Sequence, residues 1–162
     1  FLTGLPLGFQ TLNGVGFDVR GRLQLWADAA WLDAYPQRVQ IPLGQRARRL
    51  HFLHAAMHGE QPQTEIGRYG VSYEDGRTNQ FPVLFGGQLA HWRPEANDVT
   101  HDDFTQVAWT GTNVTASLGS RRTRLYHTKW DNPLPEVRIR SLEVSSAKTK
   151  AGPFVIAITL EP

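Results

Sequence analysis

The stretch that decides the fold is Arg68–Phe85, which reads RYGVSYEDGRTNQFPVLF. Every second residue is apolar in its first and last thirds, which is the period-two pattern of half-buried strands. Between these runs lies Asp75-Gly76, a dipeptide that favours tight hairpin turns because it readily adopts the positive φ that such turns require. Pro82 cannot donate to a ladder, so we expect the second strand to lie at a sheet edge or to bulge there. The stretch therefore predicts an antiparallel hairpin.

Short runs of the same alternation recur along the chain, separated by glycine and proline. The apolar phase of one run flips between Ile139 and Leu142, which predicts a β-bulge near Arg140 and Ser141. The run Phe154–Ile158 is apolar on both faces, so we expect it at a central position in a sheet. Trp26–Tyr35 could form one short helical turn. The further strands that we expect are Gly16–Leu25, Ala47–Ala55, Thr123–Trp130, Val137–Val144 and Phe154–Leu160.

These elements predict an all-β protein. A chain of 162 residues corresponds to one domain, so we expect residues 1–162 to form a single unit. Seven or more short antiparallel strands favour a β-sandwich of the jelly-roll type, with about eight strands and less than about a tenth helix. The chain starts at Phe1 without an initiator methionine or a signal sequence, and we expect it to be a piece of a larger multidomain protein.

Composition excludes several classes of protein. The chain has no cysteine, which rules out a disulfide scaffold, a thiolate nucleophile and a cysteine-based metal site. Its 17 basic and 15 acidic residues give a net charge of +2, so no nucleic-acid partner is expected. The longest uncharged apolar run, Phe154–Leu160, is far shorter than the roughly 20 residues of a membrane helix, so no membrane partner is expected either.

Five tryptophans are the most informative chemical feature. A flat indole ring can stack on the apolar C–H face of a pyranose, while neighbouring polar side chains bond its hydroxyl groups. Trp92, Trp109 and Trp130 each have such polar neighbours within four residues. The alternative is that these tryptophans fill the core between two sheets.

Two groups of residues could form a sugar site. One is a strand face, and the other is a cluster in the irregular region between residues 86 and 120. We favour the cluster, because it combines stacking rings with short polar side chains on loops. The strand face would hold Arg124, Tyr126, Thr128 and Trp130, and the loop cluster would hold Trp92, Asp98, His101, Trp109 and Asn113.

The histidines and one acidic loop are the candidate metal ligands of the chain. His51 and His54 are three residues apart and point to opposite faces of a strand, so with His58 they favour structural hydrogen bonding over a shared metal. Oxygen ligands of the kind that calcium prefers are concentrated in one loop, and the alternative is that they are simply solvated. No cofactor is required, and a structural calcium ion would be held by Asp98, Asp102 and Asp103, with Asn97 nearby.

Catalytic motifs do not occur in the sequence. A glycosidase needs a pair of carboxylates about 5–10 Å apart, and the glutamates are scattered without an evident pair. There is also no nucleophile elbow, phosphate loop or dinucleotide fingerprint. We therefore expect no enzyme, and the alternative is a polysaccharide hydrolase or lyase.

Eight short motifs occur together along the chain. They are Gly14–Arg20 (GVGFDVR), Ile41–Gly44 (IPLG), Leu50–His54 (LHFLH), Glu65–Tyr69 (EIGRY), Tyr73–Arg77 (YEDGR), Trp109–Asn113 (WTGTN), Leu125–Tyr126 and Trp130–Pro133 (WDNP). In this order they resemble a family of bacterial galactose-binding-like β-sandwich domains, which are often appended to glycoside hydrolases and other exported proteins.

The resemblance implies a non-catalytic carbohydrate-binding module that binds a plant or microbial polysaccharide or oligosaccharide. It also implies a tethered catalytic domain and a secreted or periplasmic location. Ala90-His91-Trp92 stands where members carry Asp-Trp-Trp, and Val114 stands where members carry proline. The alternative function is a structural or protein-interaction domain, which predicts buried tryptophans and an exposed apolar patch.

Overall fold

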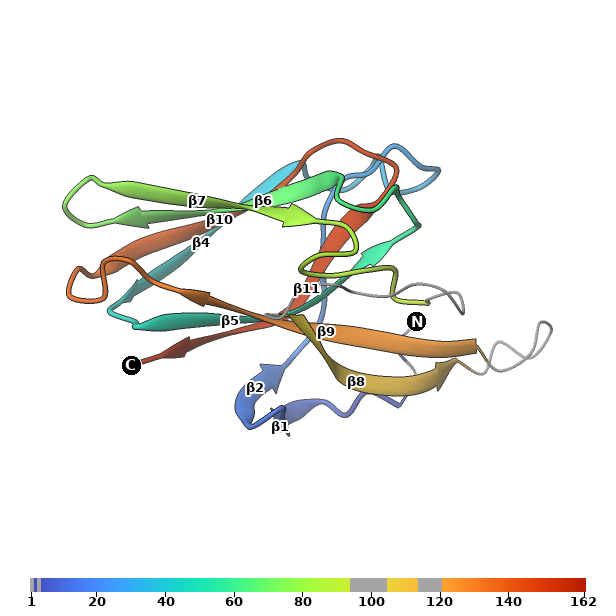
Figure 1. Cartoon of the computed structure of the whole chain (residues 1–162), viewed down its shortest axis with the longest axis horizontal. Helices are drawn as coiled ribbons and strands as arrows, with labels where there is room; N and C mark the ends of the chain where they lie inside the picture. Colours follow the sequence, from blue (N-terminus) through green and yellow to red (C-terminus); the bar gives the residue numbers. More distant parts are fainter. Residues whose placement is uncertain (1, 3, 94–104, 114–120) are drawn as a thin grey trace.

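The structure is a computed structural model, and it describes residue 2 and residues 4–93, 105–113 and 121–162 (Figure 1). Eleven strands and no helix occur in these ranges. The strands are β1 (Gly8–Leu12), β2 (Val15–Val19), β3 (Leu23–Gln24), β4 (Arg38–Gln45), β5 (Arg49–Met57), β6 (Glu65–Tyr73), β7 (Thr78–Leu84), β8 (Thr105–Asn113), β9 (Arg121–Asp131), β10 (Ile139–Ser146) and β11 (Gly152–Glu161).

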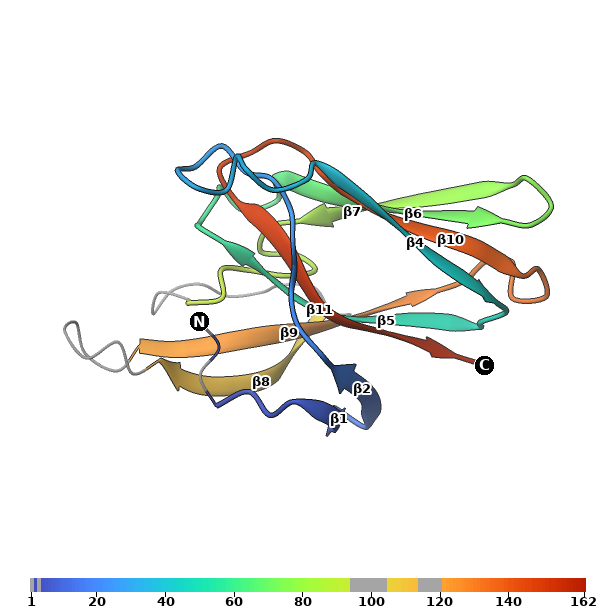
Figure 2. The same ribbon diagram turned by 180° about the vertical axis from the view of Figure 1, so that it is seen from behind.

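All strand pairs between these elements are antiparallel. One sheet has the order β4-β10-β6-β7, the other has the order β3-β11-β5-β9-β8, and β1 and β2 form a separate hairpin. The two larger sheets form two layers, and the β1–β2 hairpin lies on the far side of the five-stranded sheet (Figure 1, Figure 2). The prediction of an all-β antiparallel protein is confirmed, and the layers are compatible with a β-sandwich.

The predicted hairpin of residues 68–85 is formed by β6 and β7. Gly76 has a φ of +90°, the Tyr73 N–H donates to the Arg77 carbonyl, and the Asp75 carboxylate accepts from the Arg77 backbone N–H. β7 is an edge strand, with Pro82 opposite Arg68 of β6. The turn was therefore predicted correctly, and of the two alternatives that Pro82 left open, an edge strand or a bulge, the structure has the edge strand.

Two further strands, β10 and β11, also agree with the sequence-based predictions. The register of β10 shifts between Ile139 and Ser141 against both neighbouring strands, which is the predicted bulge. Beyond the shift, Leu142 and Val144 are buried. β11 lies between β3 and β5, as its two apolar faces predicted.

Two segment predictions were wrong. The expected strand Gly16–Leu25 is interrupted after Val19, because β2 belongs to the small hairpin whereas β3 belongs to the five-stranded sheet. Trp26–Tyr35 forms successive turns and no helix. Trp31 has a φ of +66°, a left-handed conformation that interrupts a right-handed helical path.

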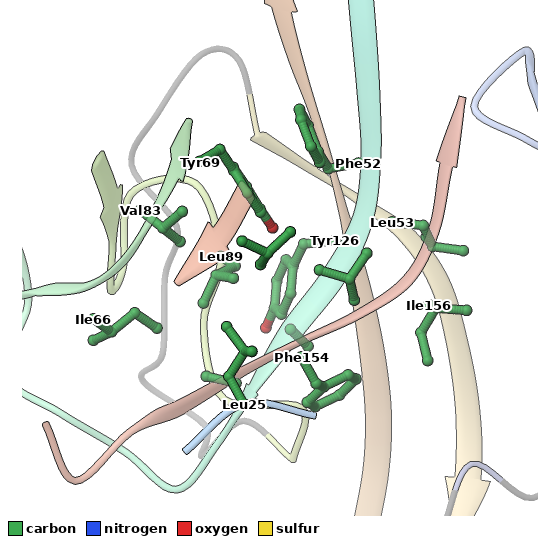
Figure 3. Packing of buried hydrophobic residues seen from close by; sticks show 14 of the residues in the cluster. Leu25, Phe52, Leu53, Ile66, Tyr69, Val83, Leu89, Tyr126, Phe154 and Ile156 are labelled. Carbon is green, nitrogen blue, oxygen red and sulfur yellow. The ribbon is translucent and has the colours of Figure 1, made fainter. Parts of the chain in front are cut away.

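The core lies between the two larger sheets (Figure 3). Phe52 of β5 and Tyr69 of β6 stack with ring centroids 4.2 Å apart and an interplanar angle of 11°. On the far face of the five-stranded sheet, Phe17 of β2 is buried and meets the edge of His127 at 5.7 Å. Because both faces of this sheet are covered, β5 is buried from Leu50 to Met57. No stretch within the described ranges is a helix that could cross a membrane.

Candidate functional site

A pocket of about 330 Å³ lies between the edge strand β7 and strand β9. β7 contributes Phe81 and Pro82, whereas β9 contributes consecutive residues near its carboxyl end. Gln88, from the segment that follows β7, completes the lining. The full lining is Phe81, Pro82, Gln88, Thr128, Lys129, Trp130 and Asp131.

Two aromatic rings form one wall of this pocket. Phe81 and Trp130 are each half-buried, and their rings stack at 4.9 Å with an interplanar angle of 14°. Phe81 also packs at 5.2 Å against Tyr69 and at 5.7 Å against Phe52, both of which belong to the core. The stack is therefore anchored in the core at one end and reaches the pocket at the other, which holds the Trp130 ring in place.

The polar side of the pocket is fixed by a buried hydrogen-bond chain. The Thr128 hydroxyl donates to the Gln88 carbonyl at 2.7 Å, because a carbonyl oxygen can only accept. His54 Nε2 lies 2.9 Å from the Thr128 oxygen, so His54 donates there through its Nε2–H. The Tyr69 hydroxyl then donates to the unprotonated Nδ1 of His54 at 2.7 Å. Every polar group in this chain has a partner.

Burial sets the protonation of this chain. Desolvation lowers the pKa of His54 to about 3 and raises the pKa of Tyr69. His54 is therefore a neutral donor to Thr128, the opposite of the arrangement in which a histidine base accepts a hydroxyl proton. In this arrangement the chain orients Thr128 in the pocket wall and does not activate it as a nucleophile.

Charged side chains lie at the pocket rim and on the outer face of the same sheet. Arg49 Nε donates to Asp131 Oδ1 at 2.5 Å, and Glu161 accepts hydrogen bonds from His51, Arg48 and Arg49. The bonds from His51 and then Arg48 lower the pKa of Glu161 to about 2. These contacts tie β5, β9 and β11 together and leave Asp131 exposed at the rim.

His51, which donates to Glu161, also contacts a second histidine, His127. Nδ1 of His51 lies 2.9 Å from Nε2 of His127. Burial, and then the nearby His51, lower the pKa of His127 to about 4. His51 and His54 thus point to opposite faces of β5 with separate hydrogen-bond partners, as the sequence predicted. Within the part of the chain that the structure describes, no three His, Asp or Glu side chains are placed to share a metal ion.

The structure places the predicted loop tryptophans away from this pocket. Trp92 is only 2% exposed. Its N–H donates to the Ala56 carbonyl and its own carbonyl accepts from Arg124, so it lies in the sheet between β5 and β9. The side chain is core, and this location corrects the expectation that its ring is a surface platform. Trp109 is half-buried on β8, with its ring lying over Gly111.

Among the remaining predicted residues, some lie in the described ranges and others lie outside them. Tyr126 is buried in the core, so it offers no accessible ring, whereas its strand neighbour Trp130 lines the pocket. The residues outside the described ranges are Asn97, Asp98, His101, Asp102 and Asp103, which include the predicted calcium ligands, and the side chain of Asn113 also lies outside the description.

Of the seven residues that line the pocket, the sequence predicts only Thr128 and Trp130 as site residues; it does not predict Phe81, Pro82, Gln88, Lys129 or Asp131. Phe81 belongs to the apolar alternation of the second predicted hairpin strand, and nothing local indicates that it meets Trp130, which is 49 positions further along the chain. The edge position predicted from Pro82 was the available signal, because an edge strand leaves inward-facing side chains within reach of solvent. Comparison with protein-family models, with curated proteins and with solved structures found no match for this chain.

Proposed function

We propose that this protein is a non-catalytic carbohydrate-binding domain that binds a plant or microbial polysaccharide in the pocket between β7 and β9. The observation that carries the proposal is the half-exposed stack of Phe81 and Trp130 beside a pocket of about 330 Å³. This volume is at the lower end of the range for small-molecule sites, which suits one or two sugar units. We also propose that the domain has a galactose-binding-like jelly-roll fold and that it is tethered to a catalytic domain in an exported protein.

The pocket combines the two kinds of contact that a sugar ring requires. Trp130 and Phe81 offer aromatic surface to the C–H face of a pyranose, at about 0.5–1.5 kcal/mol for a stacked ring pair. At the rim, Asp131 can accept a hydrogen bond from a hydroxyl group, and the exposed Lys129 can donate one. A site of this size should bind oligosaccharides with dissociation constants between micromolar and millimolar.

A second candidate function is docking to a neighbouring protein domain. Phe9 and Leu7, at and just before β1, are about three-quarters exposed, at 73% and 74%. Val107 of β8 is also exposed, and Asn13 of the hairpin turn donates to its carbonyl at 3.4 Å, so β8 and the hairpin are neighbours. These apolar side chains favour an accessory domain that contacts a catalytic domain.

Affinity electrophoresis in gels that contain xylan, galactan or polygalacturonate separates the two functions. We expect at least one polysaccharide to retard the wild-type protein, and we expect Trp130→Ala to abolish the retardation. Phe9→Ala is the matched control, because it removes an exposed aromatic ring that does not line the pocket. If no gel retards the wild-type protein, or if Trp130→Ala is retarded as strongly, the proposed site is wrong. Release of reducing ends from the polysaccharide would contradict the non-catalytic assignment.

A further inference from the structure

Backbone strain is concentrated at one end of the molecule. Five non-glycine residues have a positive φ in the described ranges, and four of them are in three loops: Trp31 (+66°), His58 (+61°), Gln63 (+67°) and Lys148 (+65°). The loops are residues 25–37, 58–64 and 147–151, which connect β3 to β4, β5 to β6 and β10 to β11. Such conformations are unfavourable for L side chains and persist where the surroundings hold them, often at binding sites.

The three loops meet at the end of the two layers that lies opposite the β6–β7 turn (Figure 1, Figure 2). The Asp28 N–H donates to the Thr149 carbonyl at 2.8 Å, which joins the first loop to the third. The Lys150 N–H donates to the Glu60 carboxylate at 3.3 Å, which joins the third loop to the second. We call this connected surface the three-loop end. These two hydrogen bonds connect the three loops into one surface.

The side chain of Trp31 is exposed to solvent at the three-loop end. Its side chain is 51% exposed and meets the edge of Tyr35, with ring centroids 6.3 Å apart at 75°. The next residue, Leu32, is fully buried and fixes the loop to the core. A buried anchor, a left-handed backbone and an aromatic neighbour therefore hold one large indole ring in solvent. Core packing does not account for this placement.

Charged side chains accompany the ring in these loops. Asp28 and Asp33 are exposed carboxylates on the Trp31 loop, and Lys148 and Lys150 are cationic groups on the 147–151 loop. Across the described ranges, none of these four side chains forms an ion pair. The three-loop end therefore offers a stacking ring together with hydrogen-bond acceptors and donors.

We propose that the three-loop end is a second saccharide-binding site, in which the Trp31 ring stacks on one sugar unit. This proposal rests on the proposed function of the pocket between β7 and β9. A protein partner fits the surface less well, because a stable interface buries about 800 Å² on each side around several apolar anchors. Trp31 is the one exposed large apolar side chain of these loops in the described structure. A single ring among charged groups matches a single sugar unit.

Two sites on one domain make polysaccharide binding bivalent. When both sites engage one polymer chain, the second contact forms at a high effective concentration and the apparent affinity rises. Short oligosaccharides occupy the two sites independently, so the stoichiometry is two per domain. The residues at the three-loop end are separate from those that line the β7–β9 pocket, so each site can be removed alone.

Trp31→Gly is the decisive variant, because glycine adopts a φ near +66° without strain and the variant should remain folded. The ligand is the polysaccharide, among xylan, galactan and polygalacturonate, that retards the wild-type protein most, together with its hexasaccharide. By titration calorimetry we expect Trp31→Gly to weaken polymer binding at least about tenfold and to lower the hexasaccharide stoichiometry from two to one. Trp31→Tyr should restore part of the affinity, since it keeps a stacking ring.

The outcomes distinguish this inference from the function on which it rests. If Trp31→Gly binds polymer and hexasaccharide like the wild-type protein while Trp130→Ala does not, the second site is refuted and the first stands. A loss in Trp31→Gly that Trp31→Tyr does not restore also refutes stacking on this ring. If the wild-type protein binds none of the polysaccharides, both proposals fail together.

Discussion

Acid should destabilise the fold through His54, the buried histidine behind the pocket. In the native protein, burial lowers the pKa of His54 to about 3, whereas the ordinary value is 6.5. The unfolded chain therefore binds a proton at this position over a pH range in which the native state does not. Well above pH 6.5, His54 is neutral in both states and the full free energy of unfolding is present. As the pH falls from 6.5 toward 3, the unfolded chain takes up the proton and the free energy of unfolding decreases progressively.

The magnitude follows from proton linkage. Between pH 7 and pH 5, a histidine with these two pKa values costs the native state about 2 kcal/mol relative to the unfolded chain. For a domain of this length, 1 kcal/mol corresponds to about 2–4 °C in melting temperature. His54 alone should thus lower the Tm by about 4–8 °C between these pH values. His127 acts in the same direction, because its pKa is also lowered, to about 4.

A double variant isolates the contribution of His54. His54→Leu with Tyr69→Phe removes both hydrogen-bonding partners, so neither residue leaves an unpaired polar group toward the other. Thr128 keeps its bond to the Gln88 carbonyl. Urea unfolding at pH 7 and pH 5 should show that the double variant loses about 2 kcal/mol less than the wild-type protein. An equal loss in the two proteins would mean that His54 does not titrate as its burial implies, and would refute the reasoning.

Two further substitutions test the packing. Trp92→Ala should reduce the free energy of unfolding by about 3–5 kcal/mol, measured by urea denaturation, because it empties a buried indole site; a loss below about 1 kcal/mol would show that the ring is not core. Gly67→Ala should destabilise the β6–β10 pair, because its Cβ would lie 2.6 Å from the Ser145 carbonyl oxygen. Gly70→Ala, whose Cβ meets only side chains at 3.7 Å or more, is the matched control, and an equal Tm for the two variants would contradict the contact.

Local pattern in the sequence determined the features that depend on a residue and its immediate neighbours. The Asp75–Gly76 turn and the bulge before Ser141 were predicted correctly, and the edge strand that carries Pro82 was one of the two alternatives that this proline left open. The opposite directions of His51 and His54 were also predicted, because side chains alternate along any strand. These features need no knowledge of which strands become neighbours.

The tertiary structure alone decided which tryptophan is core and which lines a pocket. Trp92 and Trp130 both have polar neighbours in the sequence. The backbone of Trp92 is hydrogen-bonded to Ala56 on one side and to Arg124 on the other, which places it inside the sheet. Trp130 instead stacks on Phe81 of the edge strand β7. The exposed left-handed Trp31 also had no signal in the residues around it. Burial depends on the order of the strands in a sheet and on the layer that covers it. Contacts between residues far apart in the chain set that order, and periodicity within one strand carries no information about them.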